Sequence, residues 1–489
     1  MLSVNTNGVG SVVGNTQKLI PDAEQRTAEI SEAHNSGMHT TTFRRYASHY
    51  RALISLGVPI VVGQLGTIIL SFADTLMVGH HSMKELAAAS FVNTIFVIIL
   101  LLALGFSNGL TPIIGNYFGR DETAAIGKIV RNGALANLLV GSILLIPATL
   151  LYKYIDRMGQ PAELIPLMRP YLLVNILSLP FVCWFNTFKQ FFDAIGHTKT
   201  SMFVMIGGNI LNIAGNYVLI YGIGGCPELG LLGAGISTAF SRIAMAIGIS
   251  VVFFCISTYK NYRHFFLHST FSRHTLLHIS NLGWPLSLQM GMESAAFSLV
   301  AIMVGWIGTT ALAAHQIMLT TSQLFYLVYY GLGAAVAVRM SHFFGQHDYA
   351  AMKETSTAGF HIILTIAAIV AIPVFLLRSE IGTWFTGSEE VRLLVSHTII
   401  PLIIYQFGDG MQCTFANALR GVAHVKPMMY ISFVAYFLIS LPLSWLFGIY
   451  LQGGLVGIWS AFPICLTTAG ILYYLYFRRA LQKITVQRL

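Results

Sequence analysis

The sequence contains very few charged residues. Only 10% of its 489 residues are Asp, Glu, Lys or Arg, whereas 55% are hydrophobic. Because a water-facing globular domain carries about a quarter charged residues, this composition excludes a soluble globular protein. Apolar stretches of about 20 residues or more recur along the chain, long enough to cross a bilayer as helices. We therefore expect an all-α integral membrane protein, since transmembrane β-barrels show shorter, alternating segments.

Several kinds of chemical site also have no signature in the sequence. The five cysteines stand singly, without a CxxC pair, so neither a disulfide framework nor a zinc site is indicated. The glycine-rich stretches YGIGG and GLLGAG lack the lysine of a phosphate-binding loop. No nucleophile set and no paired His and Glu at metal-ligand spacing falls at membrane depth. We therefore expect no enzyme activity and no cofactor.

The basic residues predict the orientation of the chain. If the N-terminus is inside the cell, the inner side comprises the N-terminal tail, every second loop between spans and the C-terminus. This side contains about 21 Lys and Arg residues, and the opposite side contains about 6. Both termini are therefore expected in the cytoplasm. The net charge of +9 then needs no nucleic-acid partner, because basic cytoplasmic loops face anionic membrane lipid. The expected partners are lipid and small molecules, and the chain is expected to be a monomer.

Twelve candidate spans follow from the apolar stretches. They are centred near residues 65, 102, 140, 178, 210, 244, 290, 325, 365, 405, 438 and 466. The expected domains are a flexible cytoplasmic tail (1–45), a six-helix lobe (46–257), a basic cytoplasmic linker (258–275), a second six-helix lobe (276–478) and a C-terminal cytoplasmic tail (479–489).

The two halves of the chain repeat each other. At an offset of 226, residues 59–122 align without a gap on residues 285–348. The matching residues include turn residues as well as apolar residues of the spans. For example, Phe118-Gly119 matches Phe344-Gly345. Equivalent residues of the two halves are separated by an even number of membrane crossings. The two halves therefore have the same orientation in the membrane, and the repeat is parallel. Two pseudo-symmetric six-helix bundles of this kind are typical of secondary transporters, which bind near the bilayer midplane.

Four charged residues are expected within the spans: Asp74, Arg242, Glu293 and Asp409. A charge at membrane depth needs a partner, a water-filled cavity or a function. For Arg242 three interpretations stay open: its side chain reaches to the membrane surface, it pairs with an acid, or span 6 is misplaced by a turn.

Asparagines of span 5 are candidate neighbours of Asp74. Asn212 and Asn216 are four residues apart, so they share one helical face and offer two amide oxygens to one point. The alternative is that these amides only join helices by hydrogen bonds.

The second half carries two acids and an aromatic ring. Glu293 lies eight residues after Pro285, and Asp409 lies one helical turn after Tyr405. Two carboxylates and a ring suit a cationic ligand. The alternative is a structural acid pair that shares a proton. The residue aligned with Asp74 in the second half is Val300, so the two lobes are expected to differ chemically.

Several segments resemble the multidrug and toxic compound extrusion (MATE) family, specifically its NorM-like bacterial branch. They are SFADTLMVG, CPELGLLGAGISTA and NALRG, and the similarity extends over residues 50–478. The resemblance implies a V-shaped pair of six-helix lobes in the bacterial inner membrane. It also implies alternating-access export of organic, mostly cationic and amphipathic compounds in exchange for Na⁺ or H⁺.

The resemblance also assigns site residues. Asp74, Asn212 and Thr238 match the family's site in the first lobe, whereas Asn216 stands where some relatives carry Asp. In the second lobe the acids assigned to cation coupling match Glu293 and Asp409, with Tyr405 beside them. If Na⁺ is the coupling ion, it is expected at Glu293, Asp409 or Asp74, and no other metal is expected. The alternative function is a lipid-linked oligosaccharide flippase of the same superfamily, for which about fourteen spans and a basic cavity are expected.

Overall fold

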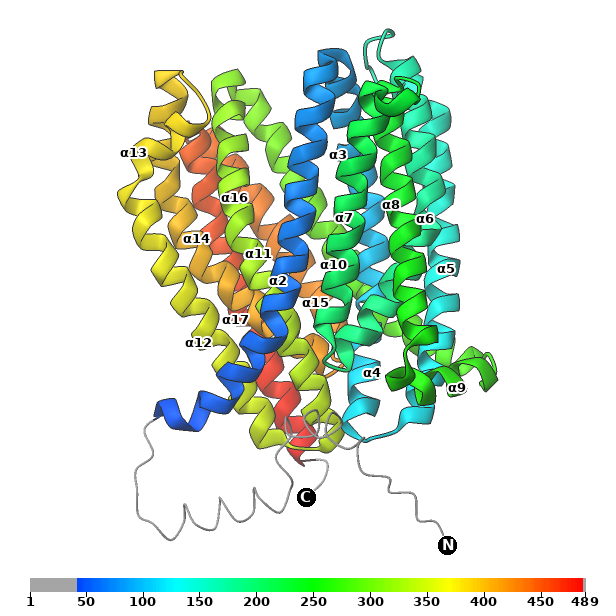
Figure 1. Ribbon diagram of the computed structural model, residues 1–489. Helices are drawn as coiled ribbons and strands as arrows, with labels where there is room; N and C mark the ends of the chain where they lie inside the picture. Colours follow the sequence, from blue (N-terminus) through cyan, green and yellow to red (C-terminus); the bar gives the residue numbers. More distant parts are fainter. Residues whose placement is uncertain (1–41, 487–489) are drawn as a thin grey trace, which may run out of the picture. The chain divides into compact units, whose positions relative to one another are not determined.

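The computed structural model describes residues 42–486, and every regular element in this range is helical (Figure 1). Contacts divide the chain into two units, Met1–Ser48 and His49–Leu489, and the account below concerns the second. The tail expected at residues 1–45 therefore lies almost wholly outside the described residues.

The first six spans form one bundle, which we call the first bundle. Its elements are α2 (Thr42–His81), α3 (Met83–Ser107), α4 (Leu110–Gly119), α5 (Thr123–Tyr154), η2 (Ile155–Arg157), α6 (Ile165–Ala194), α7 (Thr198–Tyr221), η3 (Ile223–Gly225) and α8 (Gly230–Cys255). The short α4 continues the span of α3. A single turn, η4 (Ser257–Tyr259), leads into α9 (Lys260–His268), a helix within the predicted linker.

The last six spans form the second bundle. Its elements are α10 (Arg273–Ile307), α11 (Thr309–Gln346), α12 (Tyr349–Leu376), α13 (Arg378–Ile381), η5 (Gly382–Trp384), α14 (Glu389–Gly421), α15 (Lys426–Ser432), η6 (Phe433–Ser440), α16 (Leu441–Trp445), η7 (Leu446–Tyr450) and α17 (Gly454–Val486). The segments η6 and η7 are π-helical and run on from α15 and α16 to make one span.

Twelve helices in the described range are long and apolar enough to cross a membrane. Each contains one of the twelve predicted centres, so the prediction of a twelve-span membrane protein is confirmed. Large apolar side chains such as Phe72 and Phe203 point outward, with 68% and 66% of their surface exposed. Outward apolar side chains suit a helix whose neighbour is lipid. The predicted domain boundaries, 46–257 and 276–478, stay predictions.

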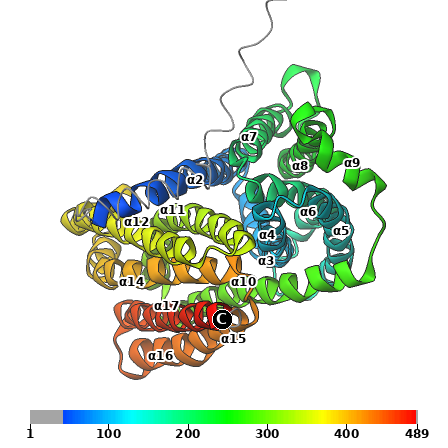
Figure 2. The same ribbon diagram turned by 90° about the horizontal axis from the view of Figure 1, so that it is seen from below.

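Figure 2 shows how the helices are grouped. Helices α5, α6 and α8 lie on one side and α12, α14 and α17 on the other, with α3, α4, α10 and α11 between them. Contacts between the bundles are made mainly by α3 with α10 and by α4 with α11. These four helices therefore form the central interface.

A row of glycines, which we call the glycine seam, brings the two bundles into close contact. It consists of Gly57, Gly105, Gly115, Gly119, Gly283, Gly331 and Gly345. A methyl group at Gly105 would lie 2.7 Å from Cα of Ser287, and one at Gly119 would collide with the carbonyl oxygen of His342. Only residues without a side chain allow backbones to approach this closely.

The contacts of the seam are reciprocal under the 226-residue offset of the repeat. Gly57 contacts Leu332, and the equivalent Gly283 contacts Phe106, which is the equivalent of Leu332. The contact of Gly105 with Ser287 is repeated by that of Gly331 with Val61. The contact of Gly119 with His342 is repeated by that of Gly345 with Asn116. Gly115 and Ser341 are equivalent to each other under the offset, so the contact between them occurs once and is symmetric.

The position of the seam shows which ends of the bundles meet. Its residues lie near the starts of α2 and α10 and near the ends of α3, α4 and α11. With the orientation predicted from the basic residues, these ends are on the cytoplasmic side. The two bundles are therefore held together on the predicted cytoplasmic side.

Candidate functional site

The first bundle brings together the four residues predicted for it. The Asn216 amide donates a hydrogen bond to the Asp74 carboxylate. The orientation of the Asn212 amide is assigned from the groups around it. In the assigned orientation its nitrogen lies 3.1 Å from Asp74 Oδ1 and its oxygen lies 3.1 Å from Thr238 Oγ1. The amide nitrogens, rather than the oxygens expected from the sequence, therefore face Asp74. Such an arrangement stabilises a carboxylate by donation and does not form a cage of oxygens.

Small residues allow the helices of this site to pack closely. A methyl group at Gly66 of α2 would lie 2.9 Å from Nδ2 of Asn209 on α7. On α7, a side chain at Gly215 would collide with the Ser237 hydroxyl of α8. The site thus forms where three helices meet at small residues.

Arg242 lies beside this site and is hydrogen-bonded inside the bundle. One of its terminal nitrogens, Nη1, donates to Asn175 Oδ1 at 3.1 Å and to Ser178 Oγ at 2.6 Å. Its charge attracts that of Asp74, and its guanidinium lies 5.9 Å from the Phe96 ring centre. The interpretation that span 6 is misplaced is therefore wrong, because α8 contains Arg242 near its middle.

The second bundle places Glu293 of α10 close to Asp409 of α14. The two carboxyl groups are near enough to influence each other electrostatically. Asp409 is 3% exposed, and among the described residues its Oδ2 has no hydrogen-bond partner. Glu293 faces the Tyr436 hydroxyl, which accepts a hydrogen bond from Gln412 at 2.7 Å. Neither acid forms an ion pair within residues 42–486.

Tyr405 is buried one turn before Asp409, as the spacing predicted. Its ring packs against Trp459 and Phe462, with centroid distances of 6.2 and 6.3 Å. Phe462 in turn stacks on Phe297 at 5.2 Å. The acids of the second bundle therefore adjoin a group of four aromatic rings.

A small cavity of about 50 Å³ lies between the bundles. Both bundles contribute to its lining, which includes Asn108, Gln289, Met290, Glu293, Tyr326, Tyr330, Gln412, Cys413, Asn417 and Arg420. The cavity thus contains one of the predicted acids, together with a basic residue that the sequence analysis did not single out.

The prediction of only four charged residues inside the spans is wrong. Lys189 and Asp193, one turn apart at the end of α6, are 9% and 4% exposed and form an ion pair of 2.7 Å. Arg420, at the end of α14, is 8% exposed. All three lie near the ends of their helices. The spacing of four between opposite charges is the signal that could have identified the ion pair.

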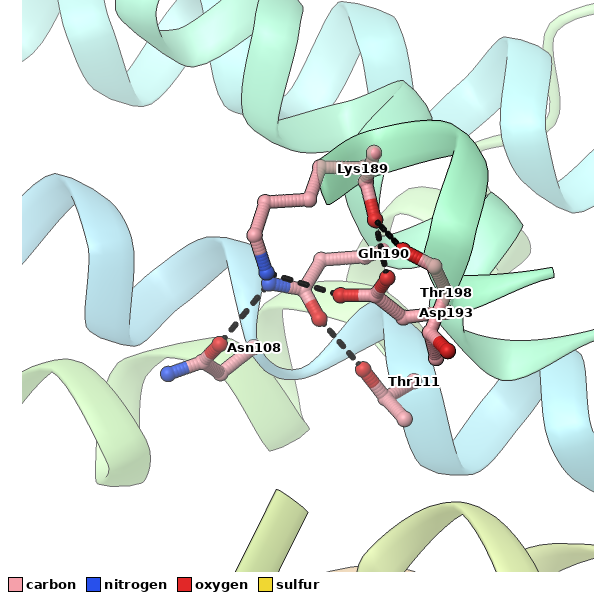
Figure 3. Close-up of polar contacts among 7 residues, drawn as sticks. Asn108, Thr111, Lys189, Gln190, Asp193 and Thr198 are labelled. Carbon is pink, nitrogen blue, oxygen red and sulfur yellow. Dashed lines mark hydrogen bonds and ion pairs between the residues drawn. The ribbon is translucent and has the colours of Figure 1, made fainter. Parts of the chain in front are cut away.

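A second group of hydrogen bonds lies beside this ion pair and joins Gln190 of α6 to Thr111 of α4 and to Asn108, which follows α3 (Figure 3). Gln190 donates to Asn108 Oδ1 at 2.9 Å and accepts from the Thr111 hydroxyl at 2.5 Å. The second oxygen of Asp193 accepts from the Ser201 hydroxyl at 2.5 Å. The polar network is therefore internally satisfied.

Known proteins resemble this chain over most of its length. The chain is 29% identical over 437 residues to the "Multidrug resistance protein NorM" of Vibrio cholerae serotype O1, covering 88% of this chain and 95% of that one. It is 29% identical over 449 residues to the "Multidrug resistance protein PmpM" of Pseudomonas aeruginosa, covering 90% and 93%.

A solved structure shares the fold. It is described as the outward-facing conformation of a multidrug resistance MATE family transporter of the MOP superfamily, and it covers 89% of this chain and 97% of that one. The TM-score is 0.81 at 20% sequence identity.

The family model described as MatE matches the chain twice, at residues 59–218 and 285–446. The two matches begin 226 residues apart, which is the offset of the repeat. Because they span well over half of the residues, the chain belongs to the MatE family, whose members are transporters rather than enzymes.

Proposed function

We propose that this protein is a multidrug efflux antiporter. It exports organic, mostly cationic and amphipathic compounds in exchange for Na⁺ or H⁺, by alternating access across a bacterial inner membrane, with both termini in the cytoplasm. The names of the relatives from Vibrio cholerae and Pseudomonas aeruginosa support export of drugs. The excess of basic residues on one side supports the orientation.

The observation that carries the proposal is the uncompensated pair of acids in the second bundle. Glu293 and Asp409 are buried near each other, and neither has an ion-pair partner among the described residues. Two such carboxyl groups need a proton, a metal cation or an organic cation to become stable inside a membrane protein. Because one cation excludes another, occupancy by the coupling ion weakens drug binding and drug occupancy weakens ion binding, a reciprocal coupling.

The first bundle supports a different role for Asp74. Two amide donors and the nearby Arg242 already stabilise its charge. Among the described residues, Oδ2 of Asp409 has no such donor, which favours the second bundle as the coupling site. In this proposal Asp74, Asn212, Asn216 and Thr238 contribute to the binding of the organic compound.

The glycine seam supports alternating access. A carrier that is closed on the cytoplasmic side must separate its bundles there to take up a compound from the cytoplasm. Glycine contacts without interlocking side chains allow the two surfaces to part.

The test is transport by the purified protein in proteoliposomes, under an imposed Na⁺ gradient and, separately, an imposed pH gradient. We expect one of the two gradients to drive efflux of a cationic dye. Asp409→Asn and Glu293→Gln are each expected to abolish gradient-driven efflux while the protein still reaches the membrane. Glu163→Gln is the matched control, because Glu163 is exposed and pairs only with Lys84.

Gradient-driven efflux at the wild-type rate in both acid variants would show that these residues do not carry the coupling. Movement of a lipid-linked oligosaccharide without dye efflux would favour the flippase alternative. For that alternative about fourteen spans were expected, whereas the described range has twelve candidates.

A further inference from the structure

A second cavity, which we call the outer groove, lies between α12, α14 and α17 of the second bundle. Its volume is about 780 Å³, and α14 packs against both of the other helices. On α14 the lining residues Met411 and Phe415 come two positions after Asp409 and Cys413, a rotation of about 200° about the helix axis. The outer groove therefore lies on the face of α14 opposite the acid and does not belong to the site between the bundles.

Four aromatic rings form the floor of the outer groove. The Phe415 ring lies 5.5 Å from the ring of Phe360 on α12, measured between centroids. It lies 4.9 and 6.1 Å from the rings of Tyr474 and Phe477 on α17. Phe415 and Phe477 are buried, whereas Tyr474 is exposed. Tyrosine is enriched where a membrane meets water, because its ring is apolar and its hydroxyl is polar.

Two basic residues line the outer groove on either side of this floor. Lys353 of α12 and Arg478 of α17 are both exposed, and within residues 42–486 the lining contains no acid. The hydroxyls of Ser356 and Thr357 each donate to the Lys353 carbonyl oxygen at 2.9 Å, so they are already used as donors inside α12. The Lys353 ammonium and the Arg478 guanidinium are therefore the charged donors that the groove offers to a ligand.

The charged and apolar parts of the groove lie at different depths. On α12, Lys353 is about 6 Å from the start of the helix and Phe360 is about 16 Å from it. Because α12 begins four residues after Gly345 of the glycine seam, this start lies on the predicted cytoplasmic side. Charge near the membrane surface and aromatic rings further in match the headgroup and the acyl chains of a phospholipid.

We propose that the outer groove binds an anionic phospholipid of the cytoplasmic leaflet. Lys353 and Arg478 hold the headgroup phosphate, and an acyl chain lies over the rings of Phe360 and Phe415. Basic pockets between membrane helices on the cytoplasmic side suit anionic headgroups. An anionic lipid fits better than a zwitterionic one, because no acid in the described lining offsets the two positive charges.

The test measures lipid retention by native mass spectrometry of the full-length protein in detergent. Delipidated protein receives either dioleoylphosphatidylglycerol, which is anionic, or dioleoylphosphatidylcholine, which is zwitterionic and has the same acyl chains. A basic residue near an anionic membrane surface contributes about a factor of five in binding. We therefore expect the wild type to retain at least about fivefold more of the anionic lipid, and Lys353→Gln combined with Arg478→Gln to lose this preference.

Arg479→Gln combined with Lys483→Gln is the matched control. Both residues are exposed on α17 and lie outside the lining of the outer groove, so this variant loses the same charge from the same end of the protein. It is expected to retain the anionic lipid as the wild type does. Because all four side chains are exposed, their replacement is expected to leave the fold intact.

Three results would overturn the proposal. The first is equal retention of the two lipids by the wild type. The second is unchanged retention of the anionic lipid when Lys353 and Arg478 are replaced. The third is an equal loss in the control variant, which would indicate attraction to the basic surface as a whole. None of these measurements involves transport, so their outcome is independent of the antiporter proposal.

Discussion

Asp74 illustrates how the surroundings of an acid decide its function. The sequence predicted which residues surround it, because asparagines at a spacing of four share a helical face. It could not predict which end of each amide faces the carboxylate, since oxygen and nitrogen are related by a half-turn of the terminal torsion. The structure places the nitrogen of Asn216 towards Asp74, and the carboxylate beside Asn212 favours the amide orientation that does the same. Asp74 therefore has an amide donor and a nearby guanidinium around it, which the described surroundings of Asp409 do not offer.

Asp74→Asn tests this interpretation. The substitution replaces the charged acceptor by a neutral amide oxygen and adds a further NH2 group beside the amide donors, so we expect the free energy of unfolding to fall by about 1–3 kcal/mol. Dye efflux should fall as well, but the remaining efflux should respond to the same gradient as the wild type, because Glu293 and Asp409 are unchanged. Thermal unfolding in detergent and proteoliposome transport measure the two effects. Complete loss of the response to the gradient would assign coupling to Asp74.

The charged residues at helix ends mark the limit of prediction at this scale. Lys189, Asp193 and Arg420 lie where a hydropathy pattern cannot distinguish a solvated boundary from the interior of a bundle. Their burial depends on a neighbouring bundle that packs over the same level. The sequence of one helix does not contain this information.

At the scale of elements, the predicted linker contains a helix that the sequence analysis did not anticipate. A basic cytoplasmic linker was expected at residues 258–275, and the structure has the helix α9 in this range, packed mainly on α5. Its Phe266 lies against Phe188 and Phe253 of the first bundle, with ring centroids 6.1 and 5.5 Å apart. Basic and aromatic residues alternate in this segment. Hydropathy averaged over a long window therefore hid its apolar face.

The attachment of the linker is expected to depend on pH. His197 shares a hydrogen bond of 2.8 Å with the Tyr259 hydroxyl, and burial lowers the pKa of His197 from its ordinary value of 6.5. The neutral ring is thus favoured in the folded state. Its contribution to stability is present above pH 6.5 and is lost as the pH falls below that value. Hydrogen exchange of residues 256–268 should accelerate between pH 7 and 5.5 beyond the intrinsic chemical effect.

His197→Asn provides the control for this measurement, because an amide oxygen can still accept from Tyr259 but does not titrate. In that variant the corrected exchange rate should stay constant over the same range. A wild-type linker that is equally protected at both values would show that the histidine does not hold it.

At the scale of the whole molecule, the twelve spans and the repeat were predictable from the sequence. Long apolar stretches are unambiguous when each exceeds the thickness of a bilayer. The glycine matches between the halves were also visible, but glycine serves a turn and a close helix contact equally well. Only the structure shows that Gly119 and Gly345 lie at the interface between the bundles.

Cross-linking of the seam should stop transport. The rings of Phe118 and His342 lie 4.8 Å apart across the interface. With Phe118→Cys and His342→Cys in a background without the five native cysteines, a short bifunctional thiol reagent should join the bundles and abolish dye efflux. Cleavage of the bridge by a reductant should restore efflux. Each single cysteine variant, treated in the same way, should keep its activity. Efflux at the normal rate through the bridged protein would contradict an opening at the seam.

The reciprocity of the seam also has a historical consequence. Three of its contacts are each made twice, and the contact between Gly115 and Ser341 maps onto itself, which places it on the axis that relates the halves. This is the contact pattern of a symmetric homodimer, in which one surface patch meets its own copy. A single six-span ancestor could therefore have formed the same interface from two separate chains before the gene doubled. After fusion each half could change independently. The first half now has Asp74 at the position where the second half has Val300.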